Sequence, residues 1–196
     1  MALRQILIAC VLSAACLACE TPDESDSDSG VIALDVDGSA DDAGFDNVDD
    51  MATEMPDSMP PMNGALTPAT PCADIAAQWP AEWVRFEDQV LERVNEFRAQ
   101  GYDCRSGGQF PAALPLTLNE ELRCAARRHS IDMGQRDFFN HVNPDGEAPD
   151  VRVGRTAYRP RAIGENIAAG QRQPGGVVQG WMNSDGHCAN IMNSLF

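Results

Sequence analysis

Hydrophobic residues recur at helical spacing in the segment 83–100. The apolar positions lie three or four residues apart: Phe86, Val90, Val94 and Phe97. This spacing places them on one face of a helix. Gly101 follows directly, and glycine is the residue that most readily takes the left-handed conformation with which many helices end. The pattern therefore predicts an amphipathic helix that packs by its apolar face and ends near Gly101.

A second helical pattern begins after Asn119. Asparagine is a favoured N-cap, and Glu120 and Glu121 place negative charge in the first turn, where the helix dipole favours it. One stripe then follows at helical spacing: Leu122, Ala125, Ala126, His129 and Met133. Because His129 falls on this apolar stripe, we interpret it as a buried supporting histidine.

The patterns become shorter towards the C-terminal end. The segment 151–160 predicts a brief helix that ends at Pro160, and Pro174 is well placed to start another. The apolar side of that helix is formed by Val177, Val178, Trp181 and Met182. The sequence NSDG, residues 183–186, predicts a turn that presents His187.

The first nineteen residues have the features of a secretory signal. Arg4 precedes an apolar run from Ile6 to Leu17, which is too short to span a bilayer comfortably. The ending SAACLACE resembles the lipobox of bacterial lipoproteins, in which a cysteine becomes lipidated, and Cys19 or Cys16 fits that role. We therefore predict a signal at residues 1–19, with a lipid anchor or a plain cleaved signal as the two outcomes.

Residues 20–71 predict an acidic disordered linker. Of the 30 acidic residues, 14 lie between Glu20 and Asp57, where no basic residue occurs. Such a segment has too few apolar residues to offset the entropy of ordering it. From Cys72 onward 16 acidic residues face 13 arginines, so the predicted domain, residues 72–196, is nearly balanced in charge. The chain has no basic face that would indicate nucleic-acid binding.

The predicted domain contains four cysteines: Cys72, Cys104, Cys124 and Cys188. An even number of cysteines behind an export signal predicts two disulfides in an oxidising compartment. Four cysteines allow three pairings. We favour Cys124–Cys188, which would hold the last motif against the second helix, together with Cys72–Cys104.

Four short motifs occur in order: LRCAARRHSIDM, FFNHVNPDG, GENIAAG and WMNSDGHCANIM. In this order they resemble the bacterial branch of the CAP superfamily, which includes cysteine-rich secretory proteins and is also called the SCP domain. The resemblance extends from about Glu82 to the end. It implies an α+β fold, an α-β-α sandwich around a small antiparallel sheet. A complete domain of this family continues through further strands, so we expect the C-terminal strands to be missing here.

The candidate chemistry lies within these motifs. Two imidazoles and a carboxylate can hold a divalent cation with a position left open, and His141, Glu165 and His187 are the candidates. By the resemblance, all three match cleft positions of the family, and the cation would be zinc or calcium. Ser184 stands where the family has a second cleft glutamate. Together with Asn166 and His129, it is expected to support the cleft.

Three functions follow from these observations. The first is an exported module whose cleft binds a cation or small ligand, with an extracellular ligand or protein as partner and with membrane contact only through a lipid anchor. The second is a metal-dependent hydrolase that uses the same cleft, with Glu165 as ligand or base. The third is a truncated, non-functional relative. We assign no catalytic residue, because Ser184 and His187 lack an orienting acid, and we favour the binding module.

Overall fold

The computed structural model describes residues 6–12, as backbone, and residues 66–196. The elements are, in order, β1 (Ile6–Leu12), α1 (Cys72–Gln78), α2 (Ala81–Gln100), β2 (Tyr102–Asp103), the 3-10 turn η1 (Arg105–Gly107), β3 (Gln109–Phe110), α3 (Glu120–Arg136), α4 (Pro149–Gly154), β4 (Gly164–Ala169), α5 (Pro174–Met182) and α6 (Asp185–Met192).

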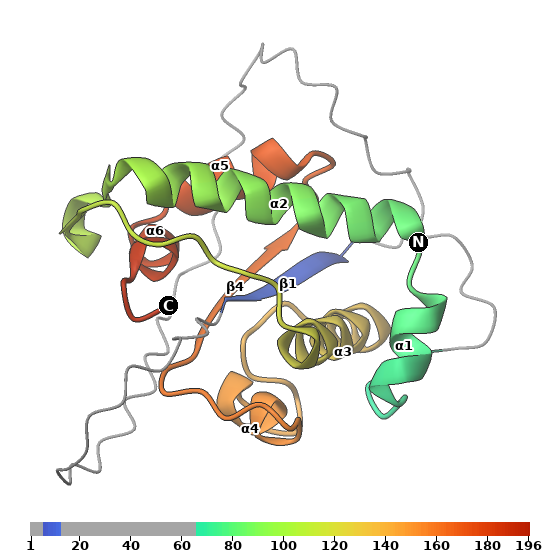
Figure 1. Ribbon diagram of the computed structural model, residues 1–196. Coiled ribbons are helices and arrows are strands. Elements are labelled where there is room, and N and C mark those ends of the chain that lie inside the picture. The colour runs from blue at the N-terminus through green and yellow to red at the C-terminus, as the bar shows by residue number, and fades with distance from the viewer. Residues whose placement is uncertain (1–5, 13–65) are drawn as a thin grey trace, which may run out of the picture.

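A small antiparallel sheet lies between two groups of helices. Strand β1 pairs with β4, with Val11 opposite Glu165 and Leu12 opposite Gly164. Helices α2 and α5 lie on one side of this pair, and α3 and α4 lie on the other (Figure 1). The predicted α+β sandwich with a small antiparallel sheet is therefore confirmed.

Helix α2 confirms the first predicted helix. Its apolar side is buried through Trp83, Phe86, Val90 and Val94. Gly101 ends the helix with a φ of 75°. A Cβ at this position would lie 2.9 Å from the carbonyl oxygen of Phe110, so both the backbone conformation and the space require glycine.

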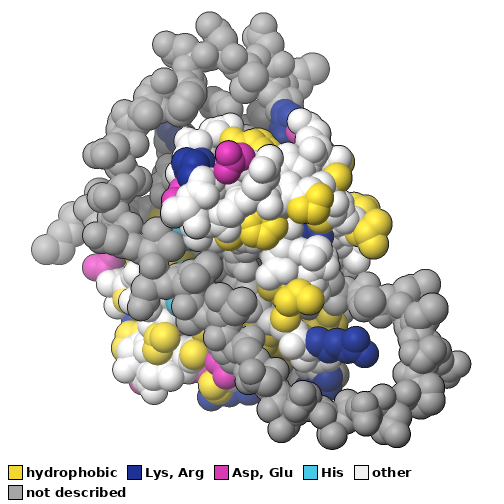
Figure 2. All heavy atoms as spheres, turned by 90° about the vertical axis from the view of Figure 1, so that its left-hand side faces the viewer, with side chains coloured by type: hydrophobic (Ala, Val, Ile, Leu, Met, Phe, Trp, Pro, Cys, Tyr) yellow, Lys and Arg dark blue, Asp and Glu magenta, His cyan; other side chains and the backbone are white. Residues whose placement is uncertain are grey.

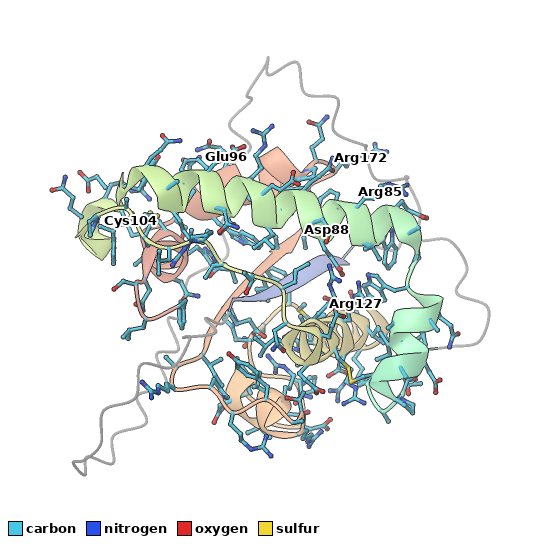
Figure 3. All side chains as sticks on the ribbon, viewed as in Figure 1. Arg85, Asp88, Glu96, Cys104, Arg127 and Arg172 are labelled. Atoms are coloured by element: carbon cyan, nitrogen blue, oxygen red, sulfur yellow. A yellow bond between two sulfur atoms is a disulfide. The ribbon has the colours of Figure 1, made fainter. Side chains whose placement is uncertain are left out.

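Helix α3 confirms the second predicted helix and its cap. The side-chain oxygen of Asn119 accepts hydrogen bonds from the backbone N–H groups of Glu121 (3.0 Å) and Leu122 (3.2 Å). Ion pairs join α3 to α2. Arg123 lies 2.7 Å from Asp88, and Arg127 donates to both carboxylate oxygens of Glu87. Figure 3 shows Asp88 and Arg127 in the space between the two helices.

The C-terminal elements differ from the prediction in two places. Helix α4 ends at Gly154, six residues before Pro160. The predicted turn at NSDG is confirmed for Asn183 and Ser184, which connect α5 to α6. Its second half is wrong, because α6 already begins at Asp185 and His187 lies inside that helix. An extended serine followed by an aspartate in the first turn is a helix start, and this outweighs the turn tendency of the same residues. Helix α5 begins at Pro174, as predicted.

The N-terminal predictions fall mostly outside the described residues. Cys16, Cys19 and residues 20–65 of the predicted linker lie there. Strand β1 includes the first half of the apolar run predicted as a signal core. The folded body also extends before Cys72, since Leu66 is buried and Gln135 donates a hydrogen bond of 2.5 Å to its carbonyl oxygen. None of the described helices is long and apolar enough to cross a membrane.

Two disulfides are present, but the favoured pairing, Cys124–Cys188 with Cys72–Cys104, is wrong. The structure pairs Cys72 with Cys124 and Cys104 with Cys188, each with a Cα–Cα distance of 5.5 Å. The reason lies in the packing of the segments. Helix α1 starts beside α3, whereas Cys104, at the far end of α2, lies beside α6 (Figure 3). Arg105 next to it bonds Asp185, the first residue of α6, at 2.6 Å.

Six large hydrophobic residues are exposed on the described part of the chain. The exposed large hydrophobic residues are Leu114, Leu118, Phe139, Val142, Val151 and Leu195. Figure 2 shows one face, on which the yellow apolar patches are small and are separated by backbone and other side chains, drawn in white. Isolated exposed hydrophobic side chains are ordinary on folded proteins, so this face gives no argument for a docking surface.

Candidate functional site

His141 and Glu165 form a direct contact between a loop and the sheet. His141 lies in the loop between α3 and α4, and Glu165 projects from β4. The His141 Nδ1 atom lies 2.8 Å from Glu165 Oε1. Burial raises the pKa of Glu165, but the hydrogen bond from His141 and the positive charge of Arg152 outweigh it and leave the pKa below its ordinary value. The carboxylate is therefore ionised and can only accept hydrogen bonds. Nδ1 of His141 must then carry the proton of this hydrogen bond.

This arrangement fixes the orientation of the His141 ring. With the proton on Nδ1, the lone pair of the neutral ring is on Nε2, which points away from Glu165. A histidine that donates one ring N–H to a carboxylate is the usual arrangement for a metal-binding imidazole. Glu165 therefore holds the His141 ring in one orientation.

Arg152, on α4, is a site residue that the sequence analysis missed. Its Nη2 atom donates to both oxygens of Glu165, at 2.9 Å and 2.8 Å. Its Nη1 atom donates to the carbonyl oxygens of His141 (2.9 Å) and Glu147 (2.8 Å). The side chain is only 7% exposed. The signal available in the sequence was indirect: a carboxylate predicted to be buried needs a cationic partner, and arginine is the usual one.

His187 reaches the same region from α6. Burial, and secondarily the charge of His141, lower its pKa to about 4. Its ring is therefore neutral at pH 7 and offers a lone pair. Its backbone is tied to β4, since Asn166 donates a hydrogen bond of 3.3 Å to the carbonyl oxygen of His187. Asn190 in turn donates to the side-chain oxygen of the fully buried Asn166, at 2.9 Å.

The remaining predicted support residues take different positions. His129 is buried, and its Nε2 atom donates to the carbonyl oxygen of Asn140 at 2.9 Å. It lies 4.0 Å from Glu165, and burial lowers its pKa. His129 thus holds the loop that carries His141. The Ser184 hydroxyl is buried and has no hydrogen-bond partner within the described part of the chain.

The loop 141–147 is held by its own polar network. The Asn143 side-chain oxygen accepts from the backbone N–H groups of Asp145 (3.0 Å) and Glu147 (2.9 Å). Its amide nitrogen donates to Asp132 on α3, at 3.0 Å. Gly146 completes the turn with a φ of 82°. The FFNHVNPDG motif therefore builds a fixed loop from which His141 projects.

Of the three predicted cation ligands, His141, Glu165 and His187, the carboxylate is already bonded to other side chains. Residues 6–12 and 66–196 contain no group of three or more His, Cys, Asp or Glu side chains arranged to hold a metal ion. Both oxygens of Glu165 are already bonded by Arg152. The carboxylate of Glu165 is therefore occupied by Arg152 and His141, and the neutral ring nitrogens of His141 and His187 are the remaining candidates for a cation.

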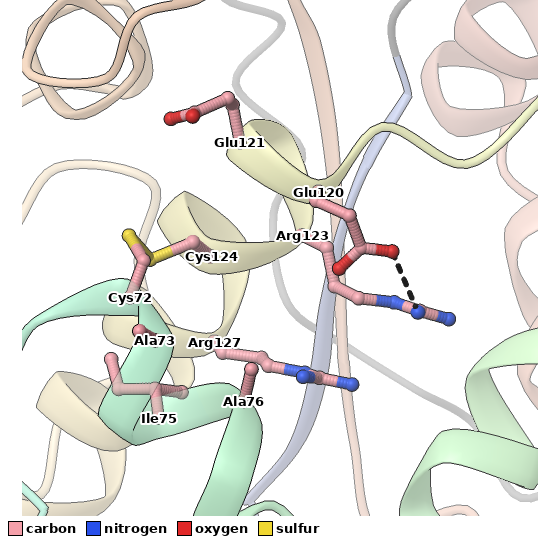
Figure 4. A pocket seen from close by; sticks show the side chains of 9 residues that line it. All are labelled: Cys72, Ala73, Ile75, Ala76, Glu120, Glu121, Arg123, Cys124 and Arg127. Carbon is pink, nitrogen blue, oxygen red and sulfur yellow. Dashed lines mark hydrogen bonds and ion pairs between the residues drawn. A yellow bond between two sulfur atoms is a disulfide. The ribbon is translucent and has the colours of Figure 1, made fainter.

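A separate pocket lies between α1 and α3, away from these histidines. Its volume is about 180 Å³. Figure 4 shows the Cys72–Cys124 disulfide in its wall and the ion pair between Glu120 and Arg123 at its other side. The pocket contains none of the predicted cleft residues, so it is not part of the candidate site.

The fold and the motif positions agree with a family comparison. The model of the CAP family, described as the cysteine-rich secretory protein family, matches residues 91–196. The chain therefore belongs to the CAP family.

Two relatives come from Bacillus subtilis (strain 168). The protein YkwD is 34% identical over 117 residues, which are 60% of this chain and 42% of YkwD. The membrane protein YlbC is 26% identical over 117 residues, which are 60% of this chain and 31% of YlbC. The match thus spans less than half the length of each relative. No solved structure matches the chain at a significant level.

Proposed function

We propose that this protein is an exported CAP-domain binding module whose cleft takes a divalent cation or small ligand between His141 and His187. The observation that carries the proposal is the hydrogen bond between His141 Nδ1 and Glu165. This bond leaves Nε2 of His141 as the free nitrogen. The charge of His141 also acts on a second imidazole, that of His187, which is neutral at pH 7.

Export is supported by three independent features. The first nineteen residues have the composition of a secretory signal. The domain contains two internal disulfides, and disulfides are usual in proteins of oxidising compartments. The matching family is described as secretory. A lipid anchor on Cys19 or Cys16 would hold the exported domain at a membrane, with the acidic linker between them.

Metal-dependent hydrolysis is the less favoured function. A hydrolase of this type needs a general base beside the metal-bound water. Glu165 is bonded by both Arg152 and His141, and Ser184 stands where the family has a second glutamate. A cleft that only binds a ligand needs no general base, so it requires neither an unpaired Glu165 nor a second glutamate at position 184.

The test is metal titration of the full chain by isothermal calorimetry. Wild type, His141→Ala and His187→Ala are compared, with zinc chloride in one series and calcium chloride in another. All three proteins share the acidic linker, so cation binding to the linker cancels. We expect one zinc site in wild type that is lost in both variants, and no ester or peptide hydrolysis. Equal zinc binding in all three proteins would refute the proposal, as would turnover abolished by His141→Ala.

A further inference from the structure

We infer that the Cys72–Cys124 disulfide is a thiol-exchange site, at which a small monothiol opens and re-forms the bond while the domain stays folded. The pocket between α1 and α3 gives this thiol its route to the sulfur atoms. The Cys104–Cys188 disulfide stays closed under the same conditions. The inference goes beyond the cation cleft and does not depend on it, because the pocket contains none of the cleft residues.

The two disulfides differ in how far they are buried. Cys104 and Cys188 are both 0% exposed. Cys72 is only partly buried, and its partner Cys124 is 5% exposed. Exchange requires a thiolate to reach one sulfur of the disulfide directly, so its rate depends on access. Access in the folded state therefore favours the Cys72–Cys124 bond.

The pocket between α1 and α3 provides this access. Both Cys72 and Cys124 line it, and Figure 4 shows their bond in its wall. Its volume of about 180 Å³ is far above the roughly 10–15 Å³ that one water needs. Its charged lining is balanced, with two carboxylates and two guanidiniums: Glu120, Glu121, Arg123 and Arg127. An entering thiolate thus meets no excess of negative charge.

The exchange has two balanced steps. The thiolate of the incoming monothiol attacks Cys72 Sγ, because Cys72 is the more exposed partner. A mixed disulfide forms on Cys72, the bond to Cys124 breaks, and the Cys124 sulfur leaves with the electron pair and takes up the proton that the monothiol lost. A second monothiol then attacks the mixed disulfide, which leaves Cys72 as a thiol and releases the oxidised reagent. The same two steps in reverse restore the bond.

Helix α1 stays in place when this bond opens, because other contacts hold it on α3. Ile75 is buried, and the guanidinium of Arg127 lies 4.8 Å from the ring centre of Trp79. Just before α1, the carbonyl oxygen of Thr70 accepts a hydrogen bond of 2.7 Å from Arg128 on α3. The two thiols therefore remain close together, which favours closure of the same bond over other pairings.

The experiment treats the folded full chain with mercaptoethanol, blocks free thiols with iodoacetamide at set times, and maps the modified cysteines by mass spectrometry. We expect Cys72 and Cys124 to be modified at least about tenfold faster than Cys104 and Cys188, with the mixed disulfide on Cys72. In concentrated urea, where folding no longer limits access, the two pairs should open at rates within about threefold of each other. Equal rates in the folded chain, or earlier opening of Cys104–Cys188, would overturn the inference.

Two alanines of α1 test the route through the pocket. Ala76 lines the pocket, whereas the neighbouring exposed Ala77 does not. Ala76→Trp should fill the pocket and slow the opening of Cys72–Cys124 by about fivefold or more, and Ala77→Trp is the matched control that should leave the rate unchanged. Equal rates in the two variants would show that the pocket is not the route. If circular dichroism shows either variant unfolded, the comparison of the two wild-type disulfides decides alone.

Reversal of the reaction tests whether α1 stays in place. After opening, an excess of the disulfide form of mercaptoethanol should restore Cys72–Cys124 as the main linkage, and the far-UV circular dichroism of the opened protein should match that of the untreated protein. Loss of helical signal on opening, or recovery of Cys72 and Cys124 mainly in other linkages, would contradict a site that works in the folded domain.

Discussion

Arg98 joins α2 to the C-terminal segment, and its replacement by methionine is predicted to destabilise the fold strongly. The side chain is fully buried. Its guanidinium donates to four backbone carbonyl oxygens, those of Leu114 (2.8 Å), Ile191 (2.5 Å), Asn193 (3.0 Å) and Phe196 (2.7 Å). Methionine keeps the apolar stem but removes every donor, so the change isolates the hydrogen bonds.

The magnitude follows from burial of the acceptors. The bonds to Ile191 and Phe196 are fully buried, and each orphaned carbonyl costs about 1–3 kcal/mol. The other two carbonyls are partly buried and can bond water. Burial lowers the pKa of Arg98, which shows that the charge itself is costly there, and losing that charge offsets part of the penalty. We expect a net loss of about 3 kcal/mol in the free energy of unfolding.

The assay is urea unfolding of the full chain, followed by tryptophan fluorescence. With a slope of roughly 2 kcal/mol per molar urea, the midpoint should fall by about 1.5 M at an unchanged slope. Arg93→Met is the matched control on the same helix, because Arg93 is partly exposed and pairs with Glu96 near the surface. This control should change stability by less than about 0.5 kcal/mol. An equally small effect for Arg98→Met would refute the reasoning.

Three further predictions concern the site and its supports. Gly164→Ala should destabilise the protein by about 1–3 kcal/mol in urea unfolding, because a Cβ there would overlap the side chain of Asn190; a wild-type midpoint would contradict this. Stability should fall as pH drops from about 6.5, the unfolded pKa of His187, towards its folded value of about 4, by roughly 1–2 kcal/mol after allowing for its partial exposure. His187→Gln should remove this part of the pH dependence, and an unchanged slope would contradict the assignment. Peptide mapping without reduction should recover Cys104 linked to Cys188, and removing this bond should cost about 4–5 kcal/mol; recovery of another pairing would contradict the structure.

The two longest helices, α2 and α3, could be predicted from local sequence patterns alone. Helix α2 was predicted from the spacing of its apolar residues, and α3 was predicted from that spacing together with the Asn119 cap. Both signals lie within about twenty residues of the feature that they predict, and both helices bury the predicted face. The turn expected at NSDG was correct only for Asn183 and Ser184, because the same local signals also fit the start of α6 at Asp185. Ser184 and Asp185 favour a turn and a helix start alike, and the packing of α6 decides between them.

Contacts between distant segments were not predictable from spacing. The cysteine pairing depends on which ends of α1, α2, α3 and α6 meet, and sequence order does not fix this. The contact of His141 with Glu165 was expected from the family resemblance. The role of Arg152 was missed, because a residue between two valines in a short helix gives no local sign of a partner thirteen positions away.

The central claim is that His141 and His187 together offer the cation site, with Glu165 behind His141. Crystals of the full chain soaked in a zinc salt and measured at the zinc absorption edge test it directly. The account predicts one anomalous peak within roughly 2.0–2.1 Å of a ring nitrogen of each histidine, with the Glu165 oxygens outside bonding distance. A peak bonded to Glu165, or no peak at these histidines, would contradict it.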